Sequence, residues 1–120
     1  MQTPEVPWKQ EIVTSLTSFA PLDRATQALV KRMCDFIHQL PATSPEPHEA
    51  GLTEHDDGYV LWHDESSQAM VEVFFVPGYP PSVHVGHEDG EPQYLCCYTR
   101  HTRRRVNLLI HLLEETPTCH

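Results

Sequence analysis

The middle of the sequence has no positive charge. Lysine and arginine are absent from Met33 through Thr99, and the whole chain has 8 of them against 17 aspartates and glutamates, a formal net charge of −9. A protein that binds nucleic acid needs a basic surface to neutralise phosphates. The charge balance therefore excludes direct nucleic-acid binding and predicts an acidic surface.

Other absences exclude further classes of protein. Apolar runs such as Leu108–Ile110 are far shorter than the roughly 20 residues of a membrane-spanning helix. The first residues lack a basic segment followed by an apolar one, so we expect no signal peptide and a reducing, cytoplasmic location. Neither a GxSxG nor an HExxH motif occurs, and no glycine-rich phosphate loop is present.

Two long amphipathic helices are predicted, one before and one after a group of strands in the sequence. Residues 22–40 carry apolar side chains at helical spacing, and Asp23 suits the positive end of that helix. Residues 102–115 carry a second apolar stripe, with Thr102 as a candidate N-cap. A short helix is also predicted over about residues 8–18, near the N-terminus.

Residues 58–99 predict an antiparallel four-stranded β-meander. Apolar and polar side chains alternate there in four runs, which turn-forming residues separate. In the third run Val83 and Val85 fall on one face and His84 on the other. Helices, then strands, then a helix indicate an α+β fold. We expect helices 22–40 and 102–115 to pack on one face of this sheet, with the other face partly in water.

The rest of the chain is predicted to lie at the surface of one domain, residues 1–120. Residues 41–57 are interpreted as a proline-rich, acidic surface linker, because proline favours extended backbone and is excluded from central strands. Residues 116–120 are expected to form a frayed tail.

Four cysteines and nine histidines raise the question of metal binding or catalysis. No spacing matches a zinc site, because Cys96 and Cys97 are adjacent and point to opposite faces of a strand. His63 and His84 could share the wet face, and either cysteine could pair with His84. We predict no catalytic residue, metal or cofactor, and keep a His/Cys-based metal-binding protein or small enzyme as an alternative.

Arg100 and the run Arg103–Arg105 stand at the start of the last helix, where positive charge opposes the helix dipole. Two interpretations remain open. The arginines pair with acidic residues of nearby turns, such as Asp89 or Glu91, or they bind a small anion such as phosphate.

The acidic residues of the linker and turns form the candidate binding surface. A field of one sign attracts a partner of opposite charge and speeds its association, although the same charges would also keep a small protein soluble. Two aromatic residues are expected to anchor the partner. The predicted partner-binding residues are Glu54, Asp56, Asp57, Asp64, Glu65, Glu88, Asp89, Glu91, Trp62 and Tyr79.

In size, in acidity and in its lack of a catalytic signature, the chain resembles small acidic α+β inhibitors. These include bacterial toxin-immunity proteins and the phage or mobile-element proteins that block host defence, such as anti-CRISPR proteins. The resemblance implies a non-enzymatic protein that occludes a basic surface of a partner, for example a nuclease or another nucleic-acid-binding complex. A homodimeric structural or assembly subunit is a further alternative, because a sheet edge or an uncovered face can pair two copies.

Overall fold

The computed structural model describes residues 6–18, 23–64, 68–87, 90 and 93–115, so the tail at 116–120 lies outside the described residues. In these residues it has three helices and five strands. In chain order they are α1 (Pro7–Thr17), α2 (Arg24–Gln39), β1 (Glu49–Leu52), β2 (Gly58–Asp64), β3 (Ala69–Phe75), β4 (Ser82–His87), β5 (Gln93–Cys97) and α3 (Arg103–Glu115).

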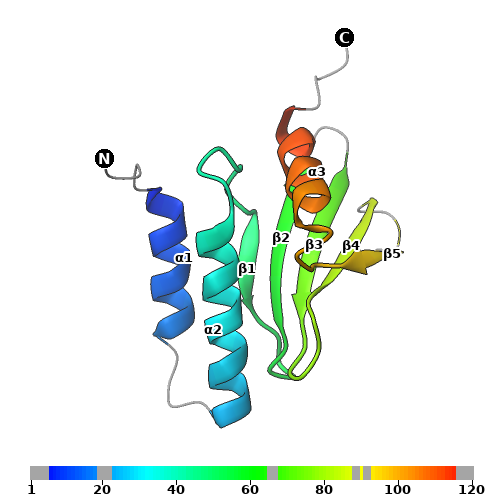
Figure 1. Ribbon diagram of the computed structural model, residues 1–120. Coiled ribbons are helices and arrows are strands. Elements are labelled where there is room, and N and C mark those ends of the chain that lie inside the picture. The colour runs from blue at the N-terminus through cyan, green and yellow to red at the C-terminus, as the bar shows by residue number, and fades with distance from the viewer. Residues whose placement is uncertain (1–5, 19–22, 65–67, 88–89, 91–92, 116–120) are drawn as a thin grey trace.

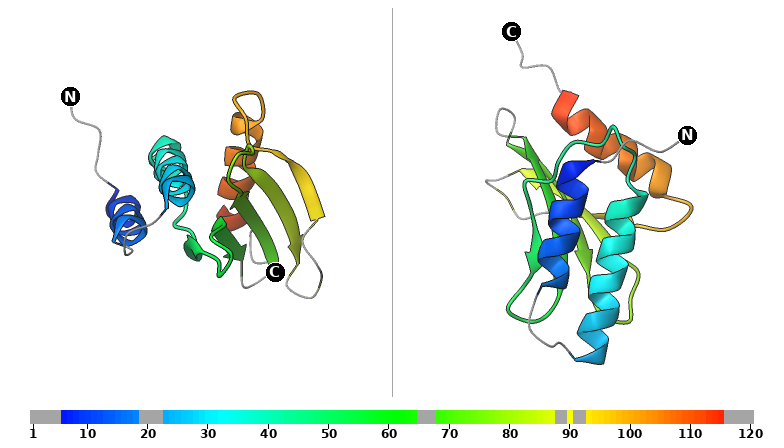
Figure 2. Two further views of the ribbon diagram at one scale, coloured as in Figure 1. Left: turned by 90° about the horizontal axis from the view of Figure 1, so that it is seen from below. Right: turned by 90° about the vertical axis from the view of Figure 1, so that its left-hand side faces the viewer.

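The five strands form one antiparallel sheet in the order β1-β2-β3-β4-β5, a meander in which each strand pairs with its neighbour in the chain. All three helices lie on the same side of this sheet (Figures 1 and 2). α2 and α3 pack against the sheet, and α1 lies alongside α2 (Figure 1). The predicted α+β class and the one-sided arrangement of helices are confirmed.

The main core helix, α2, follows the predicted apolar stripe. Asp23 is its N-cap rather than part of its first turn, because a side-chain oxygen of Asp23 accepts a hydrogen bond from the Thr26 N–H at 2.7 Å. At the other end, the Lys9 ammonium of α1 donates to the carbonyls of His38 and Leu40. A cation at this end complements the helix dipole and ties α1 to α2.

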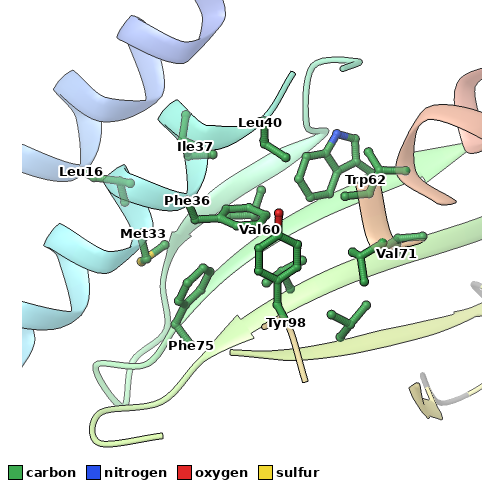
Figure 3. Close-up of a cluster of buried hydrophobic side chains, with 14 of the residues drawn as sticks. Leu16, Met33, Phe36, Ile37, Leu40, Val60, Trp62, Val71, Phe75 and Tyr98 are labelled. Atoms are coloured by element: carbon green, nitrogen blue, oxygen red, sulfur yellow. The ribbon is translucent and has the colours of Figure 1, made fainter. Parts of the chain in front are cut away.

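The core lies between α2, α3 and the sheet, and Phe36 stands at its centre (Figure 3). The Phe36 ring makes edge-to-face contacts with Trp62, Phe75 and Tyr98, at centroid distances of 6.2, 5.5 and 4.9 Å. Gly58 lets β2 approach α2 closely, because a Cβ atom there would lie 2.3 Å from the Met33 sulfur. These contacts hold the sheet firmly against the helices.

The segment 41–57 is not only a surface linker, because it contains β1. Glu49–Leu52 pairs with β2 and makes a fifth strand where four were expected. The segment before it is also held in place: Trp62 Nε1–H donates to the Pro45 carbonyl at 2.9 Å, and Ser44 is buried. The strand escaped the sequence pattern because it has four residues, one of them Gly51, directly after a proline-rich stretch.

The shorter predicted elements have the expected positions. α1 covers Pro7–Thr17, where a helix over about 8–18 was predicted. Thr102 occupies the N-cap position of α3, because its carbonyl accepts from the Val106 N–H at 3.0 Å. Its hydroxyl makes other bonds, since it donates to the Cys97 carbonyl and accepts from the Thr99 N–H. In the described part of the chain, no helix is long and apolar enough to cross a membrane.

Candidate functional site

In the described part of the chain, one face of the sheet carries no helix, and we call it the open face (Figure 2). Its residues follow from the pleat, because Val60, Trp62, Val71, Val73 and Val83 are buried beneath the helices and their neighbours in the strands point the other way. The open face consists of Glu49, Tyr59, Leu61, His63, Met70, Glu72, Phe74, Ser82, His84, Tyr94 and Cys97.

Aromatic rings form a cluster on one half of the open face. His84 lies between Phe74 on β3 and Tyr94 on β5, with ring centroids 6.4 and 6.0 Å away. A β-bulge between Val83 and His84 shifts the register of β4 against β5, so that His84 pairs with Tyr94. Tyr94 is 59% exposed, which makes it the most accessible large side chain of the cluster.

Carboxylates occupy the other half of the open face. The Tyr59 hydroxyl donates to Glu49 Oε1 at 2.7 Å, and this bond, with partial burial, raises the pKa of Tyr59 to about 12. Glu72 lies on the central strand β3, between Leu61 and His84 in the cross-strand pairing. The strands β1 to β5 contain no lysine or arginine, so the open face has no cation of these types to neutralise the two carboxylates.

The ionised carboxylate of Glu72 is energetically unfavourable in the folded protein. Burial raises the pKa of Glu72, the charge of His84 opposes this rise, and the charge of Glu49 adds to it. The net rise means that the folded protein holds the Glu72 proton more tightly than the unfolded chain does. The ionised group therefore lowers stability at neutral pH, and such strain is typical of functional positions.

Replacing this carboxylate by an uncharged amide should stabilise the protein. We expect Glu72→Gln to raise the free energy of unfolding at pH 7 by less than about 1 kcal/mol, because a half-buried carboxylate keeps part of its hydration. The gain should shrink as the pH falls and vanish below about pH 4, where the carboxyl is protonated in both states. Thermal melts at the two pH values measure it. The control Glu11→Gln, at an exposed position of α1, should change little, and a loss of stability in Glu72→Gln at pH 7 would contradict this account.

The structure divides the sequence-predicted binding residues between the two ends of the sheet. Glu54 and Asp56 are exposed and Asp57 is half-buried, and all three lie in the turn between β1 and β2. Asp64 is half-buried at the far end of β2, because an antiparallel meander places successive turns at alternate ends. The other four predicted acidic residues, Glu65, Glu88, Asp89 and Glu91, lie outside the described residues.

The two predicted aromatic anchors have opposite environments. Trp62 is 1% exposed and points into the core between α2, α3 and the sheet, so its selection as a contact residue is wrong (Figure 3). The alternation of its strand allowed either face, and the structure places Val60 and Trp62 in the core. Tyr79 is 68% exposed in the turn between β3 and β4, where a partner could reach it.

The metal and catalytic alternatives gain little from the geometry. In the described residues no group of three or more His, Cys, Asp or Glu side chains is placed to hold a metal ion. His63 and His84 do share the open face, but their strands are separated by roughly 10 Å, and the two residues are also offset along the strands. Ser82 Oγ lies 3.0 Å from His84 Nε2, a contact of a hydroxyl with a base. Acyl transfer needs oxyanion donors as well, so this contact alone assigns no reaction.

The two adjacent cysteines face opposite sides, as predicted. Cys96 packs against the core, whereas the Cys97 sulfur lies 3.2 Å from the Tyr94 hydroxyl on the open face. Sequence reasoning did not select Glu49, Glu72, Phe74 or Tyr94 as binding residues. The sequence did predict that one face of the meander stays partly in water. The residues of that face could be named only once the pairing of the strands was known.

Comparison of this chain with protein-family models, with curated proteins and with solved structures found no match.

Proposed function

We propose that the protein is a non-enzymatic binding protein that holds a basic segment of a partner protein on its open face. The partner's basic surface, the surface it uses for nucleic acid, is thereby occluded. One observation carries the proposal: a sheet face without a helical cover combines half-buried apolar side chains with two carboxylates and has no lysine or arginine.

The composition of the open face fits arginine and lysine side chains. Glu49 and Glu72 supply negative charge, and a guanidinium group can bind a carboxylate through two parallel hydrogen bonds. The rings of Phe74 and Tyr94 supply faces on which a cation stacks favourably. Leu61 and Met70 add apolar area that a partner removes from water. Apolar burial then supplies affinity, and the carboxylates select a basic partner.

The acidic turns contribute at longer range. Glu54 and Asp56 lie at one end of the sheet and Asp64 at the other, so negative charge flanks the open face at both ends. Exposed charges of this kind speed the approach of an oppositely charged protein more than they strengthen the final complex. In this proposal the turns steer the partner and the open face binds it.

A homodimer through the open face is the weaker interpretation. A two-fold axis through the middle of the open face would bring Glu72, on the central strand, towards Glu72 of the other copy. Like charges placed opposite each other are costly at an interface. The mass in solution, measured by light scattering, separates the two interpretations, and we expect a monomer.

The resemblance to toxin-immunity and anti-defence proteins agrees with this mechanism, because occlusion of a basic surface needs no catalysis. Under the proposal the protein acts as a stoichiometric inhibitor of a nuclease or another nucleic-acid-binding complex.

Affinity capture from the source cell with two matched tyrosine variants tests the proposal. Tyr94→Ser removes a ring from the open face. Tyr79→Ser removes an exposed ring from the β3–β4 turn, outside the open face; the sequence suggested Tyr79 as an anchor, and the proposal leaves it out of the contact. We expect the wild type and Tyr79→Ser to retain a basic protein that high salt releases. Tyr94→Ser should bind that protein about tenfold more weakly, since aromatic residues dominate interface energies. Equal retention by both variants would place the contact away from the open face.

A further inference from the structure

A cavity of about 210 Å³ opens between α2, the end of β3 and the segment that leads from β5 into α3. It lies on the helix-covered side of the sheet, away from the open face. The buried rings of Phe36, Phe75 and Tyr98, which lie close together in Figure 3, line it. Phe36 and Tyr98, which are 4% and 8% exposed, form the accessible part of an apolar floor that is continuous with the core.

Among the described residues, three arginines and one aspartate also line the cavity. Arg32 and Asp35 come from α2, Arg100 precedes α3, and Arg103 is its first residue. In the part of the chain that the structure describes, the one ion pair within 4.0 Å joins His55 to Glu54, so none of the three arginines is neutralised there. Positive charge thus exceeds negative charge around this cavity, in a protein whose net charge is −9.

The arginine side chains, rather than the start of the helix, are the groups available to an anion. The Arg103 backbone N–H already donates to the Thr99 carbonyl at 2.9 Å. Arg32 is oriented by donation to the carbonyls of Val76 and Tyr79, which uses two of the five donors of a guanidinium group. The charge of Arg103 acts on the Tyr98 hydroxyl, where it partly offsets the rise in the pKa that burial causes. The guanidinium charge of Arg103 therefore lies close to the apolar floor.

We propose that this cavity binds a small phosphomonoester, with its phosphate on the arginines and an apolar body on the aromatic floor. A phosphomonoester carries a charge of about −1.5 to −2 at pH 7, which matches three guanidinium groups opposed by one carboxylate. Guanidinium groups bind phosphate through paired hydrogen bonds. This inference is independent of the proposed function, because it uses a different side of the molecule.

The size of the cavity limits the ligand. Pockets for drug-sized molecules measure roughly 300–1,000 Å³, and this cavity, at about 210 Å³, is smaller. It suits a phosphate joined to a single ring or a short aliphatic chain. Phenyl phosphate has both parts, and inorganic phosphate has only the first, so the two probes separate the contribution of the arginines from that of the floor.

An amide NMR titration of the full chain in a phosphate-free buffer tests the proposal. We expect phenyl phosphate to give saturable shifts at the backbone amides between Tyr98 and Arg103, and to bind more tightly than inorganic phosphate. Arg100→Gln and Arg103→Gln should each weaken the binding of phenyl phosphate about three- to tenfold, because each removes one charged hydrogen bond at a partly exposed site. Arg104→Gln is the matched control, because Arg104 is exposed on the same helix and does not line the cavity.

Three results would overturn the proposal. If Arg104→Gln weakens phenyl phosphate as much as Arg103→Gln does, the anion is attracted by the basic start of α3 and not by the cavity. If phenyl phosphate and inorganic phosphate bind alike, or if neither gives saturable shifts at these amides, the aromatic floor takes no ligand. Unchanged melting temperatures of the three variants ensure that a weaker titration reports on the cavity rather than on unfolding.

Discussion

Phe36→Ala should lower the free energy of unfolding by about 3–5 kcal/mol, which is the range for removal of a buried phenylalanine side chain. Phe36 is 4% exposed and contacts three other aromatic rings, one each from β2, β3 and the segment after β5. Its loss removes apolar burial and these ring contacts together. The cavity that remains would be shared by α2 and the sheet, and neither can close it without moving the other.

Denaturant titration measures the free energy of unfolding of Phe36→Ala, with His38→Ala as the control variant. His38 is exposed on the same helix, so its replacement should change the free energy of unfolding by less than about 0.5 kcal/mol. Near-equal unfolding curves for Phe36→Ala and the wild type would mean that α2 does not pack on the sheet through this ring.

Charge reversal on the open face should have the largest effect on partner binding. We expect Glu49→Lys to weaken the complex with the captured basic partner about tenfold or more, because it replaces an attraction by a repulsion at the contact itself. The complex of this variant should dissociate faster and also form more slowly than that of the wild type. Surface plasmon resonance at two salt concentrations measures both rates.

Two further charge-reversal variants distinguish residues that contact the partner from residues that only speed its approach. Glu54→Lys changes a turn at the end of the sheet, so it should slow association and leave dissociation nearly unchanged. Glu11→Lys places the same change on α1, on the far side of the molecule from the open face, and should have the smallest effect. Equal losses from all three variants would mean that the partner responds only to net charge.

Regular periodicity made much of the fold predictable from the sequence. The apolar stripe of α2 and the alternation in β2 to β4 were sufficient to name the elements, the fold class and the one-sided packing. β1 was missed because four residues around a glycine carry too little alternation, and its pairing with β2 is a long-range contact that proline-rich composition argued against.

The binding face was less predictable, because a sequence pattern does not say which side of a sheet the helices will cover. Phe74 and Phe75 are adjacent and equally apolar, yet Phe75 is buried in the core and Phe74 lies on the open face. Trp62 was selected as an anchor for its residue type and proved to be a core residue. The position of Tyr94 on the open face depends on the bulge between Val83 and His84, because the bulge pairs Tyr94 with His84. The alternation of residues in β5 does not indicate this bulge.

Alkylation of the cysteine thiols, with and without the bound partner, tests most directly whether the open face is the docking surface. Cys97 is a half-buried thiol on the open face, beside Tyr94, and Cys34 is a half-buried thiol on α2. Peptide mass spectrometry follows the two sites separately in one sample. We predict that the partner slows the alkylation of Cys97 several-fold and leaves Cys34 unchanged. Protection of Cys34 with unchanged reactivity at Cys97 would contradict the account and move the interface to the helical side.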